Sequence, residues 1–170
     1  MSLTSLLKPL TVLVCAITLM GGCHYISDEF GEEKMIPNPL PTEFPYDLQG
    51  TAYKIWIADE MQLKSGPLTS YVVMQGVNNP DTGDELEQHA IAQLVKLTDD
   101  KELRIEVRSR DELERVIGQV YVGQRNINLE MIRSGWCQYD GSEFAEAPEF
   151  AAAQAEAQQA KRGMWAAAGN

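Results

Sequence analysis

The residues of this sequence that could do chemistry are a few oxygen-bearing side chains and one arginine. Asp59 lies in an acidic turn, Asn78 and Asp81 lie in a loop built from Asn, Pro, Asp and Gly, and Arg115 begins a β-rich stretch. Carboxylate and amide oxygens are ligands for hard divalent cations, and a guanidinium binds phosphate oxygens. There is no C-x-x-C pair, no glycine-rich phosphate loop and no convincing Ser-His-Asp set.

The elements that must position these residues follow from periodicity. Alternating apolar and polar residues predict short strands, and apolar residues three and four apart predict helices. Such short strands joined by tight turns favour a small closed or nearly closed barrel in an α+β domain. The expected strands are 51–57, 61–64, 69–74, 103–108 and 115–122, and the expected helices are 84–97, 128–133 with Asn128 as its cap, and 148–160.

Net charge restricts the partners. The chain has 170 residues and a formal charge of −11. Only Lys8 is basic in the first 22 residues, so a form starting at Cys23 would have 13 − 25 = −12. Such a charge disfavours non-specific binding to long nucleic acid, which requires a basic surface, although a local basic pocket is still compatible with it.

The N-terminus is typical of an export signal. Lys8 precedes an apolar stretch from Leu10 to Met20, whose eleven residues are too few to span a bilayer. The following Met20-Gly21-Gly22-Cys23 resembles the lipobox of bacterial lipoproteins, in which the cysteine receives a lipid and the chain is cut before it. An ordinary cleaved signal with an incidental cysteine is the alternative. Acyl chains on Cys23 would anchor the protein to a membrane of the cell envelope.

The remaining divisions follow from composition. Residues 23–46 contain acidic residues and Pro37, Pro39, Pro41 and Pro45, which predict an extended tether. We expect the domain at 47–166 and a short tail at 167–170. His24, in place of an aspartate after Cys23, leans toward the outer membrane over the periplasmic face of the inner membrane if the common enteric sorting rule applies. Cys137 is expected to be a small buried residue.

The second half of the domain contains a family's motifs in order. Asn128-x-x-Met131-Ile132-x-x-Gly135-Trp136 is followed by Ala155-Glu156-Ala157 and by Gly163-x-Trp165. Together these resemble the staphylococcal-nuclease-like (thermonuclease) family over about residues 51–166. The resemblance implies a five-stranded OB-fold barrel with three helices, and calcium-dependent hydrolysis of phosphodiesters as the usual activity.

Two of the three site motifs of that family are partly kept. Its acidic turn Asp-Gly-Asp-Thr matches residues 57–60, where only Asp59 falls on a metal-ligand position. Its Asp-x-Tyr-Gly-Arg matches residues 111–115, where Asp111 and the phosphate-binding Arg115 agree. Each residue also has a plain structural interpretation, as a solvated turn aspartate and as a surface arginine paired with Glu114 or Asp111.

The remaining motif, Arg-Leu-x-Gly-Ile-Asp-x-Pro-Glu, matches residues 73–81 and is altered at three positions. Its arginine is Val73, its metal aspartate is Asn78, and its glutamate is Asp81, which is one methylene shorter. A divalent cation, a positioned carboxylate and two arginines are what the chemistry requires. The alternative that the sequence leaves open is that Arg104, Arg108 or Lys54 reaches the site and replaces the arginine that the family has at position 73.

Three functions are therefore compatible with the sequence. The first is a lipid-anchored module with an impaired site that binds an unidentified ligand or protein partner through its barrel. The second is a residual calcium-dependent nuclease, with Asp59 and Asn78 as metal ligands and Asp81 and Arg115 as catalytic residues. The third is an envelope protein in which the barrel acts only as a spacer.

Overall fold

A computed structural model describes residues 24–27, 33–36, 45–79 and 84–166, which form two separate compact units. The predicted signal segment 1–22, Cys23, Asp81 and the tail 167–170 lie outside these ranges. In the first unit, β1 (His24–Ser27) pairs antiparallel with β2 (Glu33–Ile36). This hairpin falls within the predicted tether and was not expected from its composition. The prolines of that segment all follow β2, so they remove no N–H from the ladder.

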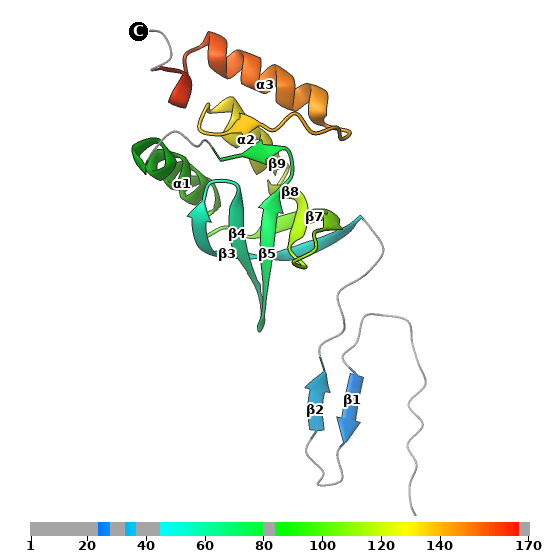
Figure 1. Ribbon diagram of the computed structural model, residues 1–170. Helices are drawn as coiled ribbons and strands as arrows, with labels where there is room; N and C mark the ends of the chain where they lie inside the picture. Colours follow the sequence, from blue (N-terminus) through cyan, green and yellow to red (C-terminus); the bar gives the residue numbers. More distant parts are fainter. Residues whose placement is uncertain (1–23, 28–32, 37–44, 80–83, 167–170) are drawn as a thin grey trace, which may run out of the picture. The chain divides into compact units, whose positions relative to one another are not determined.

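The second unit is built on a five-stranded barrel (Figure 1). The sheet runs in the order β5-β4-β3-β7-β8, and a parallel pairing of β5 with β8 closes it. The two-residue β9 (Arg125–Asn126) extends the edge of β8. The predicted α+β barrel is therefore confirmed. Its strands are β3 (Tyr46–Ile57), β4 (Glu60–Ser65), β5 (Leu68–Met74), β7 (Leu103–Arg110) and β8 (Val116–Val122).

Strand β3 is longer than the predicted 51–57 because it serves two partners. Its first half, Tyr46–Gly50, pairs with β7, and its second half pairs with β4. Gly50 lies at the change of partner, where a Cβ atom would collide with the backbone of Lys64. A glycine interrupts the alternation of side chains, so periodicity alone begins the strand after it.

The core lies inside the barrel and under the helices. Along most of each strand every second residue points inward, and register shifts interrupt this alternation in β3 and β7. The fully buried apolar side chains of the strands are Met61, Leu63, Val72, Leu103, Ile105, Val107 and Val120.

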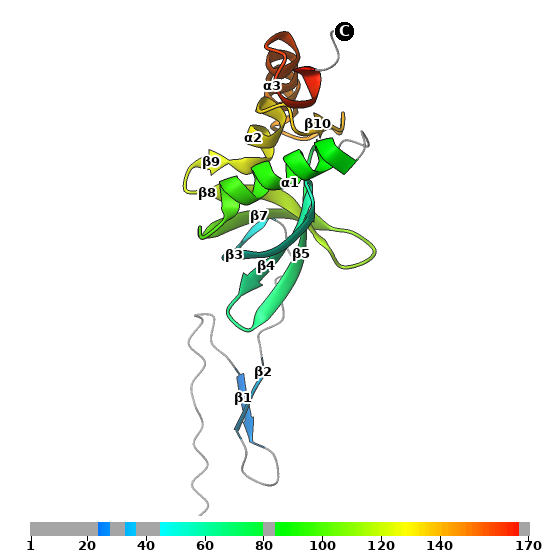
Figure 2. The ribbon, with the colours of Figure 1, turned by 90° about the vertical axis from the view of Figure 1, so that its left-hand side faces the viewer.

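Three α-helices gather at one end of the barrel, away from the β4–β5 turn (Figures 1 and 2). Both views show α2 between the barrel and α3. Their buried faces are formed by Ala90, Leu94, Ile127, Met131, Ile132, Phe150, Ala153 and Ala157. The helices are α1 (Asp84–Thr98), α2 (Ile127–Arg133) and α3 (Ala147–Gln159), followed by the 3₁₀ turn η1 (Gly163–Ala166). Within the described ranges, none has the length and apolarity needed to cross a bilayer.

The cap of α2 differs from the prediction. Asn126, not Asn128, is the N-cap, and its side-chain oxygen accepts a hydrogen bond of 3.0 Å from the Leu129 amide. Asn128 is fully buried instead. It accepts from the Val120 amide at 2.9 Å and donates to the carbonyl of Gln75 at 3.0 Å and that of Gly118 at 3.1 Å. One asparagine therefore ties α2 to β8 and to the loop that follows β5.

The glycines of the C-terminal motifs are explained by a close backbone contact. Gly135 follows α2, Gly163 follows α3, and the Met164 amide donates to the Gly135 carbonyl at 2.9 Å. A Cβ atom on Gly163 would collide with the backbone of Gly135, and Gly163 has a φ of +52°. The spacing of these glycines therefore reports helix packing rather than chemistry.

Candidate functional site

The acidic turn between β3 and β4 is held against the loop that follows β5. The Asn79 amide donates to Oδ2 of Asp59 at 3.1 Å, and the Ala58 amide donates to Oδ1 of Asn79 at 3.3 Å. The Met74 amide also donates to the Asp59 carbonyl at 2.8 Å. The structure thus brings together the turn and the loop that the family motifs place in one site.

Asp59 is the residue of this site with an unused ligand atom. Its Oδ1 is buried and has no hydrogen-bond partner within the described part of the chain. Burial raises the pKa of the Asp59 carboxyl, although the hydrogen bond from the Asn79 amide opposes that shift. A buried carboxylate oxygen without a donor is destabilising unless a cation or a water satisfies it.

Asn78, the predicted second metal ligand, is placed differently. It belongs to β6 (Val77–Asn78), which pairs with β10 (Gln138–Tyr139), and it is exposed. The neighbouring Asn79 makes the contacts with the turn, and its amide group also reaches Oε1 of Glu87 on α1 at 3.4 Å. Sequence reasoning missed Asn79 because a motif alignment does not distinguish the contacts of two adjacent asparagines.

Arg115 is held by two carboxylates. Its Nε donates to Oδ2 of Asp111 at 2.7 Å, and its Nη1 donates to Oε1 of Glu60 at 2.5 Å. Oδ1 of Asp111 also accepts from the backbone amides of Leu113 and Arg115 at 3.0 and 2.9 Å. Partial desolvation of Asp111 favours its neutral form, but the hydrogen bonds from Arg115 prevail and lower the pKa of this carboxyl.

Val73 lies directly opposite the carboxylate that holds Arg115. It is the cross-strand partner of Glu60 in the β4–β5 ladder and of Ile117 in the β5–β8 pairing. Residues 60 and 73 therefore share one face of the sheet. Glu60 was not among the predicted site residues. Its position directly after Asp59 and the alternation of side chains along β4 could have placed it on the same face of the sheet as Val73.

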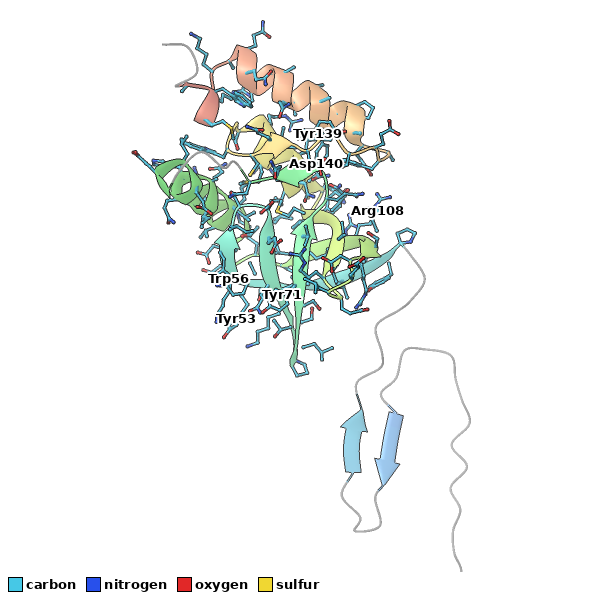
Figure 3. The ribbon with its side chains drawn as sticks, viewed as in Figure 1. Tyr53, Trp56, Tyr71, Arg108, Tyr139 and Asp140 are labelled. Carbon is cyan, nitrogen blue, oxygen red and sulfur yellow. The ribbon has the colours of Figure 1, made fainter. Side chains whose placement is uncertain are left out.

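The cations that were considered as replacements are engaged elsewhere. Arg104 pairs with Asp47 at 3.2 Å and lies over the ring of Tyr121. Arg108 pairs with Glu106 and Glu146, each at 2.8 Å, and Figure 3 shows it well apart from Trp56 and Tyr71 of the β3–β5 face. Lys54 lies 5.5 Å from the ring centroid of Tyr53.

The described donors do not fit a calcium ion. Ca²⁺ takes six to eight oxygen ligands, several of them from carboxylates. No group of three Asp, Glu, His or Cys side chains with metal-binding geometry occurs in residues 24–27, 33–36, 45–79 and 84–166. Asp59 offers one free oxygen, Glu60 is paired with Arg115, and Asn78 is neutral. Asp81 lies outside the described residues.

Comparison with known proteins decides the family. The sequence profile described as "Staphylococcal nuclease homologue" matches residues 71–167, which is more than half of the chain. The chain belongs to this family. This family is typically calcium-dependent, and the described residues of this chain contain no group of three side chains that could hold the ion.

Individual relatives agree with that assignment. The chain is 30% identical over 93 residues to the probable staphylococcal-like nuclease CAN2 of Oryza sativa subsp. japonica, a match that covers 55% of this chain and 25% of the relative. It is 27% identical over 104 residues to an uncharacterized endonuclease of Haemophilus influenzae, covering 61% of this chain and 58% of the relative. The chain thus spans about a quarter of the plant protein and somewhat more than half of the bacterial one.

Proposed function

We propose that this SNase-like domain is strongly impaired in hydrolysis and acts as a binding module of the cell envelope. The observation behind this proposal is the double engagement of Arg115 by Asp111 and Glu60, with Val73 opposite Glu60. Phosphodiester hydrolysis by this family's chemistry needs two cationic groups on the phosphoryl oxygens. One is absent here, and the other must first leave two carboxylates.

The absence of a cationic group at position 73 lowers the expected rate of phosphodiester hydrolysis. Removing one donor that stabilises transition-state charge lowers a rate by about 10² to 10³. The neutral Asn78 and the shortened Asp81 weaken the metal and base functions further, although such effects do not simply add. We therefore expect turnover of single-stranded DNA or RNA that is indistinguishable from background.

The test compares the purified chain with its Arg115→Ala and Arg115→Lys variants on labelled single-stranded DNA and RNA, in calcium and in EGTA. Equal, negligible rates for all three proteins support the proposal. Calcium-dependent hydrolysis by the parent that both variants lose would overturn it. Arg115→Lys keeps a cation that can pair with Glu60, so it separates a lost guanidinium from a misfolded loop.

A residual calcium-dependent nuclease is the second candidate. It is supported by the unpartnered Oδ1 of Asp59 and by the names of the relatives, which are nucleases or endonucleases. This function requires Asp81 and the side-chain carbonyl oxygen of Asn78 to bind the calcium ion together with Asp59. Calcium at millimolar concentration would then raise the melting temperature of the parent and leave that of Asp59→Asn unchanged.

The envelope location rests on Cys23 and the small residues before it. A diacylglyceryl group on this thiol would hold the chain at the membrane surface. The parent is expected to partition into the detergent phase of Triton X-114 and to incorporate labelled palmitate, whereas Cys23→Ser does neither. Incorporation that persists in Cys23→Ser would contradict the proposal, and membrane fractionation would show whether His24 directs the protein to the outer membrane.

A further inference from the structure

The outward face of β3, β4 and β5 presents three exposed aromatic rings (Figure 3). Tyr53, Trp56 and Tyr71 are 55%, 48% and 50% exposed. The rings of Trp56 and Tyr71 are stacked, with centroids 5.9 Å apart and an interplanar angle of 15°. We call these three residues the aromatic shelf. A contiguous group of exposed rings indicates an interaction surface, whereas a single exposed ring would not.

Two rings of the aromatic shelf lie where β3 departs from regular pairing with β4. The register shifts between Ala52 and Lys54 and again between Ile55 and Ile57, so Tyr53 and Trp56 are the extra residues of two β-bulges. In a regular strand, residues three positions apart point to opposite faces. A bulge redirects a side chain. The bulges therefore allow both rings to be exposed on one strand.

The loop between β7 and β8, residues 111–115, lies beside the aromatic shelf. Val116 on β8 is the parallel neighbour of Val72 on β5, and both side chains are buried. The residues that precede them, Arg115 and Tyr71, therefore share the outward face of the barrel. The loop itself projects from the barrel (Figure 2).

This loop holds an exposed leucine in a fixed position. Leu113 is 76% exposed, the highest value among the large hydrophobic side chains that the structure describes. Oδ1 of Asp111 accepts from the amides of Leu113 and Arg115 at 3.0 and 2.9 Å, and the Asp111 carbonyl accepts from the Glu114 amide at 3.0 Å. A side chain on such a closed loop loses little conformational freedom on binding. We call Glu112-Leu113-Glu114, all of them exposed, the acidic loop.

The two ends of this surface have opposite charge. Lys54 on β3 and Lys64 on β4 place their ammonium groups 5.5 and 5.7 Å from the Tyr53 ring centroid, and neither forms an ion pair with another described residue. The acidic loop lies on the other side of β5, next to Tyr71. Because neighbouring strands are about 4.8 Å apart, the lysines and the acidic loop are separated by roughly 10 Å or more.

A surface with a basic end, an apolar middle and an acidic end is complementary to a second copy of itself. Rotation by 180° about an axis perpendicular to the surface places the acidic loop of each copy on the lysines and rings of the other, so the same contact forms twice. The net charge of −11 opposes association elsewhere on the molecule. An anionic membrane fits this surface less well, because its headgroups would repel the acidic loop.

We propose that two copies of this chain associate through this surface, with the aromatic shelf of each copy packed against the acidic loop of the other. Arg115 lies next to Tyr71 on the outward face, so a partner copy would cover it and close the Glu60–Arg115 site. The inference goes beyond the proposed function, since an impaired and an active domain could both associate in this way. The hydrolysis assay therefore tests one proposal and the oligomeric state tests the other.

The experiment is sedimentation equilibrium of the purified full chain in a density-matched non-ionic detergent. We expect a monomer–dimer equilibrium with a dissociation constant of about 1–100 µM, because the surface is smaller than the standard interface of about 800 Å² per partner. Every variant has the same N-terminal segment, so any sharing of detergent micelles is common to all of them. Circular dichroism checks that each variant is folded.

Substitutions on the two halves of the surface should have matching effects. Trp56→Ala and Tyr71→Ala on the aromatic shelf, and Leu113→Ala on the acidic loop, should each weaken dimerisation about tenfold or more. Leu68→Ala is the control, because Leu68 is 41% exposed but lies at the β4–β5 turn, outside both groups. It should leave the dissociation constant unchanged.

Charge reversal tests the arrangement of the two copies. One variant has Lys54→Glu with Lys64→Glu, the other has Glu112→Lys with Glu114→Lys, and each should be monomeric alone because like charges then face each other. An equimolar mixture should dimerise, since every contact in the mixed pair joins glutamates to lysines. Lys96→Glu on α1 adds a negative charge outside the surface and should leave the parent's dimerisation intact.

Four results would overturn the proposal. The first is a parent chain that stays monomeric up to about 1 mM, a concentration at which even weak specific association is visible. The second is dimerisation that Trp56→Ala and Leu113→Ala leave intact, and the third is a mixture of the charge-reversed variants that stays monomeric. The fourth is a monomeric parent that binds phosphatidylglycerol vesicles and loses this binding in Trp56→Ala, which would assign the surface to a lipid bilayer.

Discussion

Asp59→Asn should stabilise this protein at neutral pH. The parent keeps a carboxylate in a partly buried position, where one oxygen accepts from the Asn79 amide and the other has no partner among the described residues. Asparagine can keep the first contact through its carbonyl oxygen. The second oxygen becomes a neutral amide nitrogen, whose burial is less unfavourable than that of a charged oxygen.

The magnitude follows from the unpartnered atom. An unsatisfied buried acceptor costs about 1–3 kcal/mol, and the low end applies here because solvent still screens part of the carboxylate, so we expect a gain of about 1 kcal/mol. For a domain of this size the gain corresponds to a melting temperature about 4 °C higher.

The dependence on pH gives this prediction its sign. Burial raises the pKa of Asp59 above 3.8, so the folded protein holds an extra proton between 3.8 and the raised pKa. The free energy of unfolding therefore falls as pH rises through that window and is constant above it. In Asp59→Asn this decline is absent, and the two proteins should differ most at neutral pH and least below pH 3.8.

Urea unfolding from pH 3 to pH 8, in EGTA, measures both quantities. Asp111→Asn is the matched control, because Arg115 lowers the pKa of Asp111. Stability from that carboxylate is present above pH 3.8 and is lost as pH falls through the lowered pKa, so its replacement should destabilise the protein at neutral pH. The reasoning is refuted if Asp59→Asn destabilises the protein at pH 7, or if its effect is the same at every pH.

Three further predictions concern packing. Asn128→Ala removes the hydrogen bond that the Val120 amide donates to it, and one of the two that the Gly118 and Gln75 carbonyls each accept. It should reduce the free energy of unfolding by about 2 kcal/mol in urea titrations, against about 1 kcal/mol for loss of the cap in Asn126→Ala. Gly163→Ala should reduce the free energy of unfolding by about 2 kcal/mol or more, since strain at its φ adds to a collision with the backbone of Gly135. Gly123→Ala, with a φ of +58° and open space around it, introduces the strain alone and should reduce the free energy of unfolding less. Burial, aided by the charge of Asp59, raises the pKa of the Cys137 thiol, so a disulfide reagent at pH 8 should label it only at the rate of unfolding. Rapid labelling of the folded protein, with Cys15→Ser and Cys23→Ser to remove the other two thiols, would contradict this.

The barrel could be predicted from the sequence because side-chain alternation survives in most of its strands. The first strand was predicted too short, since Gly50 removes a side chain where the partner changes. The bulges at Tyr53 and Trp56 were missed for a related reason. An extra residue interrupts the two-residue period without producing a pattern that identifies a bulge. The burial of Cys137 was expected and is confirmed.

The contacts within the site were less accessible to sequence reasoning. The alignment placed the 57–60, 73–81 and 111–115 segments in one site, and the first and last meet through Glu60 and Arg115. These two residues are 55 positions apart, and no local pattern pairs them. Likewise, periodicity does not reveal that Asn79 rather than Asn78 reaches the acidic turn, because that depends on the conformation of one residue in a loop.

The parallel pairing of β5 with β8 has a consequence for how this protein is made. Three neighbouring strands, β3 to β5, can pair as soon as they are synthesised, but the ring cannot shut until a strand some forty residues further along has emerged. Until then β5 has an unpaired edge capable of recruiting another chain. A truncated product that stops before β8 should therefore aggregate through that edge rather than persist as a smaller folded barrel.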